Sequence, residues 1–583
     1  MNIRTGIMPE SYKHEYVYDY SVSERKNREK SFISKKTITL DCAKNDFASF
    51  QILVLSDTDA SYTIGYEPYF SAADVRDNVR VAVECPLDIK LCHIGAVLDD
   101  DSVRKNDIML RDASVEMKKN EPCCIWAEAK IGKETAAGSY SGKIYIYTHR
   151  MFENEKLADT LDFTVNVHDV VMPEGDERRF HLDLWQHNTN IAKKHEVDLY
   201  GDEHFAVIEG YIKSLGELGQ SAITVVASEI PWSGQRCYNI KNENTDMFEY
   251  NMIRVKRSVD GTYVYDYSVM QRYIDLCMKY GINREIEVFG LCGIWIDDDE
   301  EYLFKAKDYP EYIRVRYFDE ADKTYKYIDN AADMRAYIKA LYGYFCDKGY
   351  IDIVRIAADE PADAERYEKS VAEIMAAGPE FKLKTAVNHG EFIEKFKDRT
   401  SDYVPGLAVT AQHYDILRKM TEKKTHRVLW YVCCGPHIPN TFICSNLLEA
   451  RAIGYLTKYM KFDGFLRWNY TIWPHDPRSD LRCRAPMWHC GDTNFVYPSR
   501  GGKVMLSMRY KELMRGILDY ELMCMTEEKG GEKLVCGILE DIIEIKEVSE
   551  LMNVDRMIAS EIVSLDYEKY NAAKKRMLEF LEK

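Results

Sequence analysis

Short runs of alternating apolar and polar residues dominate the first 170 or so residues of the chain. FASFQILVLS (47–56) and SGKIYIYTH (141–149) are typical, and turn residues such as Ala137-Gly138-Ser139 separate one run from the next. Alternation with a period of two predicts strands that bury one face, and no long helical period interrupts them. The pattern predicts an N-terminal β-sandwich domain over residues 1–172.

The pattern changes after the charged linker VMPEGDERR (171–179) to apolar, β-rich runs separated by helical periods, such as those at 203–219 and 331–349. The β-rich runs occupy residues 179–185, 222–228, 285–291, 351–359, 382–389, 406–412, 426–434 and 464–470. Eight strand–helix units in roughly 350 residues predict a (β/α)8 TIM barrel over residues 173–525. A doubly wound open sheet is the alternative, but no GxGxxG motif follows the first run.

Three further segments complete the organisation of the chain. The last part, residues 526–583, carries amphipathic patterns that predict a short helical C-terminal appendage. The insertion 229–266 is rich in Asn, Tyr and charge, and we expect it to fold over the active face of the barrel. The acidic stretch IDDDEE (296–301) predicts a solvated loop rather than a calcium site, because its ligand spacing is irregular.

Composition narrows the class of protein. A net charge of −18 would repel a phosphate backbone, which disfavours nucleic acid as a partner. The 16 cysteines form no CxxC pair, and reduced thiols explain them better than a metal site or disulfides. The N-terminus lacks an apolar signal core, and no run approaches the roughly 20 apolar residues that span a bilayer. These features predict a cytoplasmic protein that binds neither membrane nor metal.

Barrel enzymes place their catalytic groups where the strands end. The predicted strand ends carry aromatic rings, amides and imidazoles, and the aromatic content of 12% is high for the whole chain. Such groups suit a pocket for a sugar ring, which has both apolar C–H faces and hydroxyl groups. The expected substrate-binding residues are Trp185, His187, Asn388, His389, His413, Tyr414, Tyr431, Trp468 and Asn469.

The acidic pair Asp359-Glu360 follows the apolar run IVRIAA and precedes Pro361. Two adjacent carboxylates in a half-dry pocket do not both ionise readily, so one keeps its proton near neutral pH. Glycoside hydrolysis needs such an acid to protonate the leaving oxygen. The structural alternative is that Asp359 caps the next helix and Glu360 lies in its first turn. Neighbours on one strand favour a substrate-assisted mechanism, in which a 2-acetamido oxygen is the nucleophile.

Several motifs, taken in order, resemble a known family. HLDLWQH (181–187), AADEP (357–361), WYVCCGP (430–436), GFLRWNY (464–470) and GDTNFVYP (491–498) are similar to motifs of the domain of unknown function 4091 proteins. That group is related to glycoside hydrolase family 123, the β-N-acetylgalactosaminidases, and the resemblance runs from about residue 40 to residue 525. It implies that Asp359 stabilises the 2-acetamido group and that Glu360 is the general acid and base.

The sequence thus predicts a retaining exo-β-N-acetylhexosaminidase that needs no cofactor and acts on a small glycan or glycoside, with N-acetylgalactosamine the favoured sugar. We expect Trp468 to lie under the sugar ring, and Tyr414 or Tyr431 to donate to the acetamido carbonyl. We expect Arg509, Arg515 and Asp519 to brace the last helix of the barrel against it. The oligomeric state is left open.

Two alternatives remain at this point. One is a glycosidase for a different hexose, with Glu360 as the acid and Asp183, Asp402 or Asp476 as the nucleophile. The other is a non-catalytic carbohydrate-binding protein on the same scaffold, which the intact acidic pair disfavours.

Overall fold

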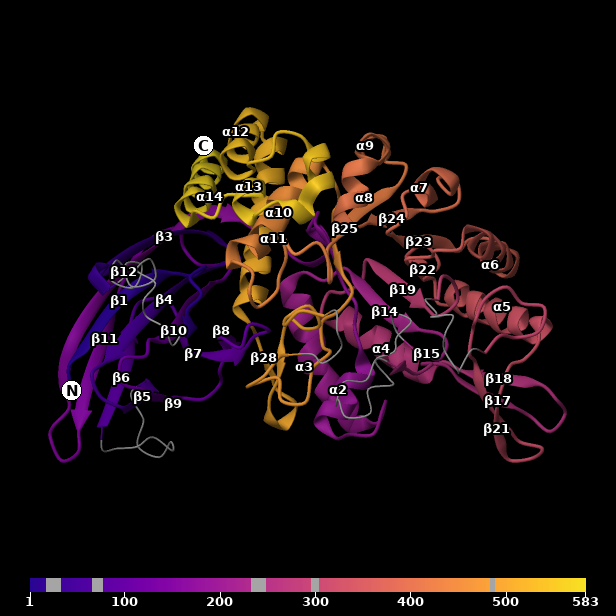
Figure 1. Ribbon diagram of the computed structural model, residues 1–583, viewed down its shortest axis with the longest axis horizontal. Helices are drawn as coiled ribbons and strands as arrows, with labels where there is room; N and C mark the ends of the chain where they lie inside the picture. The colour runs from indigo at the N-terminus through magenta and orange to yellow at the C-terminus, as the bar shows by residue number, and fades with distance from the viewer. Residues whose placement is uncertain (17–32, 66–76, 232–247, 295–303, 483–487) are drawn as a thin grey trace.

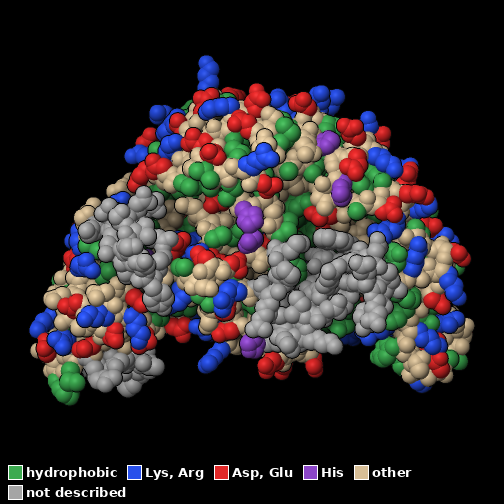
Figure 2. All heavy atoms as spheres, viewed as in Figure 1, with side chains coloured by type: hydrophobic (Ala, Val, Ile, Leu, Met, Phe, Trp, Pro, Cys, Tyr) green, Lys and Arg blue, Asp and Glu red, His purple; other side chains and the backbone are tan. Residues whose placement is uncertain are grey.

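The computed structural model describes residues 1–16, 33–65, 77–231, 248–294, 304–482 and 488–583. The N-terminal sheets form one end of the molecule, the barrel lies beside them, and the C-terminal helices pack across the junction at the top of the view (Figure 1). On the face seen in Figure 2, basic and acidic side chains are interspersed. No helix in the described ranges is both long and apolar enough to cross a membrane.

The N-terminal region is sheet-rich, as the alternating pattern predicts. One six-stranded sheet has the order β1-β4-β10-β7-β8-β2 and the other has the order β3-β12-β11-β6-β5-β9. Apolar side chains from both sheets, including Ile52, Ile125, Val81 and Ile144, meet in one buried cluster. The strands are β1 Ile3–Pro9, β2 Glu15–Tyr16, β3 Thr37–Lys44, β4 Asp46–Ser56, β5 Ala60–Ile64, β6 Asp77–Glu84, β7 Ile89–Leu98, β8 Arg104–Met109, β9 Ser114–Met117, β10 Cys123–Ile131, β11 Gly138–Arg150 and β12 Lys156–Val171.

Eight parallel strands form a nearly closed barrel in the order β13-β26-β25-β24-β23-β22-β19-β14. A bridge between Leu182 and Gln220 brings the two outer strands together. The strands are β13 His181–Leu184, β14 Ala222–Val226, β19 Glu285–Phe289, β22 Val354–Asp359, β23 Lys382–Val387, β24 Asp402–Pro405, β25 Arg427–Tyr431 and β26 Gly464–Arg467. The helices that follow them are α2 Asn188–His195, α3 Asp202–Leu218, α4 Ser268–Lys279, α5 Ala331–Asp347, α6 Ala364–Ala377, α7 Glu391–Lys395, α8 Leu407–Gln412, α9 Tyr414–Glu422, α10 Leu447–Met460 and α11 Met508–Glu528.

Seven of the eight predicted strand positions overlap a barrel strand, and the sixth is wrong. The run GLAVTAQ (406–412) is helix α8, whereas the sixth strand is the preceding segment DYVP, Asp402–Pro405. A short apolar run fits a buried helix as well as a buried strand, so periodicity alone does not separate the two. The strand itself ends at Pro405, a residue that usually argues against a central strand.

Two insertions lie between the early barrel strands, the first between β14 and β19 and the second between β19 and β22. The described part of the first contains β16 Phe248–Glu249, which pairs with β15 Ile230–Pro231. Strands β17 Arg254–Arg257, β18 Tyr263–Asp266, β20 Arg316–Asp319 and β21 Thr324–Tyr327 form a separate four-stranded sheet. Residues 232–247 of the insertion predicted to cover the active face, and the acidic stretch 296–301, lie outside the described residues.

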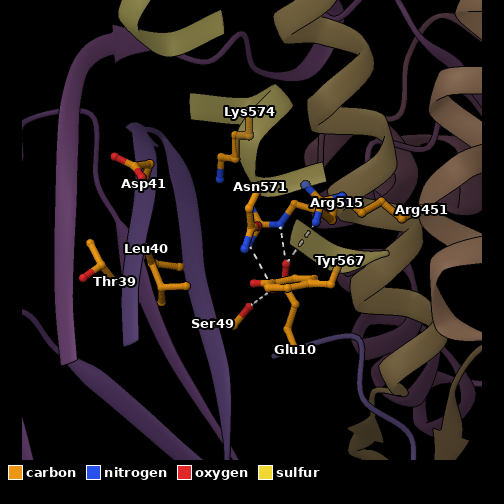
Figure 3. A pocket seen from close by; sticks show the side chains of 11 residues that line it. Glu10, Thr39, Leu40, Asp41, Ser49, Arg451, Arg515, Tyr567, Asn571 and Lys574 are labelled. Carbon is orange, nitrogen blue, oxygen red and sulfur yellow. Dashed lines mark hydrogen bonds and ion pairs between the residues drawn. The ribbon is translucent and has the colours of Figure 1, made fainter. Parts of the chain in front are cut away.

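Helix α11 joins the barrel to the N-terminal sheets. Arg515 donates to Glu10 at 3.1 Å and to Asp46 at 2.9 Å, both in the N-terminal region. Lys574, on the C-terminal helix α14 Tyr567–Glu582, donates to the second oxygen of Asp46 at 2.7 Å. Figure 3 shows Glu10, Arg515 and Lys574 of this buried charged cluster between the N-terminal strands and the C-terminal helices. The expectation that Arg515 braces α11 against the barrel is therefore wrong.

Two other residues of α11 tie it to further segments. Arg509 pairs with Asp107 of β8 and donates to the carbonyl oxygens of Thr441 and Gly491 in the barrel loops. Asp519 accepts from Arg451 of α10 at 2.7 Å. The helices after α11 are α12 Glu532–Ile542, α13 Ala559–Ile562 and α14, with a 3₁₀ segment at Val548–Arg556.

A charged layer fills the barrel interior. The Lys384 ammonium group on β23 pairs with Asp183, with Glu285 at 2.8 Å and with Glu287 at 3.2 Å. All four side chains are fully buried. Burial alone would lower the pKa of Lys384, but the three carboxylates raise it. The carboxylates lie close enough together to hold a metal ion, and here the ammonium group lies among them.

Candidate active site

The acidic pair stands where β22 ends. The five strand residues before Asp359 are buried, whereas Asp359 and Glu360 are partly exposed. Glu360 has a φ of 45°, in the left-handed region that a non-glycine residue rarely adopts. Such a conformation costs about 1–3 kcal/mol and is concentrated at functional sites. Its backbone N–H donates to the carbonyl oxygen of Ala386 on β23 at 3.2 Å, so the turn is anchored to the neighbouring strand.

A glycine on the other side of β22 supports the same turn. The backbone N–H of Asp359 donates to the carbonyl oxygen of Gly293, after β19, at 3.3 Å. A Cβ atom added at Gly293 would lie 2.7 Å from the Cβ of Ala358, and the φ of this glycine is 56°. Only glycine lets the chain approach β22 this closely.

Two barrel strands, β23 and β25, bring partners to the Glu360 carboxylate. The Tyr431 hydroxyl, at the end of β25, donates to Oε1, and the Asn388 amide, just after β23, donates to Oε2 at 3.0 Å. The structure therefore brings together Glu360 and two of the residues expected to line the pocket. A cavity of about 510 Å³ opens on Asp359 and Glu360, with Tyr312 and Arg366 among its lining residues.

Burial controls the protonation of the pair. Burial and the adjacent Glu360 charge raise the pKa of Asp359 well above its usual range. Burial also raises the pKa of Glu360, although the hydrogen bond from Tyr431 and the charge of His389 act in the opposite direction. The pair therefore holds a proton at a pH where an exposed carboxyl group has lost it, as a general acid must.

Replacement of Tyr431 by Phe should shift the pH profile of activity. The variant loses a hydrogen bond that lowers the pKa of Glu360, so that pKa rises. Because a general acid works in its protonated form, the alkaline fall in kcat/KM should move to higher pH. The measurement is kcat/KM against pH for Y431F and for the control Y414F. The Tyr414 hydroxyl donates to Met460 instead, so the Y414F profile should match that of the wild type. An unshifted Y431F profile would argue against Glu360 as the titrating acid.

A second group of predicted residues lies where β13 and β26 end. The buried His187 places Nε2 3.0 Å from the carbonyl oxygen of Trp468, and burial lowers the pKa of His187 to about 4. The neutral ring is therefore the donor in this contact. The Asn469 side chain accepts from the backbone N–H of Ile472 at 3.1 Å, and Trp185 packs edge-on against Phe289. These contacts brace the barrel rim, and Trp468 is the least buried of the four.

The remaining predicted residues are placed differently. His389 is exposed directly after Asn388, and the His413 ring packs against Gly390, where an added Cβ atom would lie 2.0 Å from its Nε2. Tyr414 does not join the group around Glu360, because its hydroxyl donates to the carbonyl oxygen of Met460 at the end of α10. The misplaced sixth strand explains this error, since Tyr414 begins helix α9 instead of following a strand.

The site predicted from the sequence did not include Asp492, a buried carboxylate at the barrel rim. Asp492 Oδ1 accepts from Arg467 at 2.7 Å and from the Trp468 indole at 3.2 Å. Its Oδ2 is buried without a hydrogen-bond partner in the described part of the chain. Burial raises the pKa of Asp492, although Arg467 opposes this. Asp492 lies in the motif GDTNFVYP (491–498), and this motif is the sequence feature that could have identified it as a site residue.

The insertion also contributes a group that the sequence did not identify. Glu249 on β16 accepts from the Thr189 hydroxyl at 2.9 Å and lies 3.9 Å from His187 Nδ1. The described part of the insertion therefore reaches the residues after β13.

The carboxylates considered as alternative nucleophiles are held elsewhere. Asp183 pairs with Lys384 in the barrel interior, and Asp402, at the start of β24, accepts from Arg355 at 2.6 Å. Asp476 is exposed in the segment that follows β26. None of the three has a hydrogen bond to Glu360 or its partners among those found in the described residues.

Comparison with known proteins identifies similar sequences and structures. Residues 185–526, more than half of the chain, match the family model described as glycoside hydrolase 123, catalytic domain. No curated protein sequence matches the chain. A family 123 glycoside hydrolase from Clostridium perfringens, studied for glycolipid glycan hydrolysis, is similar in structure, with a TM-score of 0.75 and 18% identity over 100% of this chain and 99% of its own. A β-D-glucuronidase from Dictyoglomus thermophilum has a TM-score of only 0.31 at 11% identity, covering 82% of this chain and 68% of its own.

Proposed function

Because the chain belongs to glycoside hydrolase family 123, we propose that it is a retaining exo-β-N-acetylhexosaminidase, with N-acetylgalactosamine as the favoured sugar. The nucleophile is the carbonyl oxygen of the substrate's own 2-acetamido group. Asp359 and Glu360 act on the same edge of the sugar, Asp359 on the acetamido group and Glu360 on the glycosidic oxygen. The barrel holds both residues where a strand ends.

The reaction proceeds in two steps. The pair shares one proton, and an acetamido N–H that donates to Asp359 favours the ionised form of that carboxyl group, so the proton then lies on Glu360. Glu360 donates this proton to the leaving glycosidic oxygen while the acetamido oxygen attacks the anomeric carbon. Asp359 accepts a hydrogen bond from the acetamido N–H and stabilises the positive charge that develops on the cyclic intermediate. Glu360 then acts as a base toward the water that opens this intermediate, so the anomeric configuration is retained.

The observation that carries this proposal is the arrangement of Asp359 and Glu360 at adjacent positions, with Tyr431 and Asn388 on Glu360 alone. The two donors hold the Glu360 carboxylate in one orientation, and both Asp359 and Glu360 line the cavity. The other carboxylates considered as nucleophiles are held in ion pairs or exposed elsewhere, which favours a nucleophile supplied by the substrate.

A panel of four p-nitrophenyl glycosides tests this function: β-N-acetylgalactosaminide, β-N-acetylglucosaminide, β-galactoside and β-glucoside. We expect release from the 2-acetamido sugars only, because the plain hexosides lack the nucleophile. Asp359→Asn should lower kcat for those two substrates by about 10²-fold or more, since the amide cannot balance the charge of the intermediate. Release from a plain hexoside would refute the substrate-assisted mechanism and keep Glu360 as the acid. Binding of these sugars without any release would indicate a carbohydrate-binding protein.

A further inference from the structure

A pair of adjacent thiols lies beside the candidate active site. Cys433 and Cys434 follow β25, and their Sγ atoms are 3.7 Å apart. Both side chains are partly exposed. The chain contains a second adjacent pair, Cys123 and Cys124, but these lie within strand β10, where successive side chains point to opposite faces. Their side chains accordingly join two different apolar clusters.

The thiol pair is connected to both groups of candidate site residues. Tyr431, which donates to Glu360, is only two residues before Cys433. On the other side, Asn440 donates to the carbonyl oxygen of Cys433 at 2.9 Å and accepts from Arg467 at 2.7 Å. Arg467 also holds Asp492. A change in the backbone between the two cysteines would therefore act on Tyr431 and on Arg467 together.

We propose that Cys433 and Cys434 form a two-thiol modification site, and that its oxidation to a disulfide between these adjacent residues reversibly inactivates the enzyme. The co-reactant is a low-molecular-weight disulfide. The loss of activity rests on the proposed function, whereas formation of the cross-link does not. A disulfide between neighbours in sequence is strained, because their Cα atoms are closer than a relaxed disulfide prefers, and strained disulfides are readily reduced.

The chemistry requires one thiolate and one thiol. The contact between the two sulfur atoms lowers the pKa of Cys434 and raises that of Cys433. The Cys434 thiolate attacks one sulfur of the small disulfide, forms a mixed disulfide and releases one small thiolate. Cys433 then loses its proton and attacks the Cys434 sulfur, which closes the protein disulfide and releases the second small thiolate. The two electrons lost by the cysteine pair reduce the small disulfide to two thiols.

The test treats the full-length, reduced protein with oxidised glutathione, then alkylates the remaining thiols and maps the peptides by mass spectrometry. We expect the peptide that holds Cys433 and Cys434 to lose two hydrogen atoms and to resist alkylation. The peptide that holds Cys123 and Cys124 serves as the internal control and should stay free of this cross-link. Hydrolysis of the p-nitrophenyl β-N-acetylgalactosaminide, followed in parallel, should fall by about 10- to 100-fold and recover with dithiothreitol, the range expected for a small misplacement of catalytic groups.

The variants C433S and C434S separate the possible outcomes. Each lacks one thiol, so each should keep its basal activity and resist inactivation that dithiothreitol reverses. Alkylation of both thiols in the treated wild type would overturn the modification site, and this readout needs no active enzyme. A complete cross-link with unchanged hydrolysis would overturn the link to activity. Equal inactivation of the wild type and both variants would place the sensitive thiol elsewhere.

Discussion

The Glu360→Gln variant is expected to lose about 10²- to 10⁴-fold in kcat/KM on a β-N-acetylgalactosaminide with a poorly activated leaving group, such as another sugar. The amide keeps the size of the side chain but has no proton to give to the leaving oxygen. A p-nitrophenolate leaves with little protonation, so the loss in the first step should be much smaller for that aglycone. The dependence on the leaving group identifies Glu360 as the acid, which a simple loss of activity does not.

The control for this variant is Glu368→Gln on helix α6. Glu368 is a partly exposed carboxylate that pairs with Lys395 and Arg399 at the surface. Its replacement should leave kcat/KM for both aglycones within about twofold, because such surface pairs contribute little. An equal loss in E360Q for both aglycones would contradict the assigned role and point to a general disruption of the site.

The Lys384→Met variant is expected to destabilise the protein by about 3–5 kcal/mol, the largest effect on stability that the structure predicts. Lys384 is the ammonium partner of Asp183, Glu285 and Glu287 inside the barrel, where all of these side chains are fully buried. Methionine matches its length but leaves the carboxylates without this charge. Chemical denaturation followed by circular dichroism provides the measurement.

Lys382 on the same strand provides the matched control. It is partly exposed and lies 3.7 Å from the exposed Asp352, so Lys382→Met should change the unfolding free energy by less than about 0.5 kcal/mol. Similar stabilities for K384M and K382M would show that the carboxylates of the interior do not need the ammonium group.

Much of the fold can be predicted from the sequence because most strands and helices have a clear period of apolar residues. The alternating runs before residue 170 become two sheets, and seven of the eight apolar runs that follow coincide with barrel strands. The error at residues 406–412 arose where the strand is only four residues long and ends in Pro405. Helix α8, which follows directly, is more apolar than this strand. A prediction from hydrophobicity alone therefore takes the helix for the strand.

The candidate site was only partly predictable for a related reason. Glu360, Asn388 and Tyr431 follow directly from the rule that strand ends meet at one face, and the structure brings them together. Asp492 and Glu249 come from long loops and an insertion, whose path no periodicity describes. The ion pairs of Lys384 with three carboxylates could not be predicted either, because the four residues lie on three separate strands.

In the proposed mechanism the nucleophile is the acetamido oxygen of the substrate itself. The most direct measurement compares kcat/KM for p-nitrophenyl β-N-acetylgalactosaminides whose acetyl methyl group carries zero, one, two or three fluorine atoms. Fluorine withdraws electrons from the carbonyl oxygen and weakens it as a nucleophile, so we expect kcat/KM to fall steeply with each added fluorine. A rate that stays nearly constant across the series would contradict substrate assistance and require a nucleophile from the protein or from water.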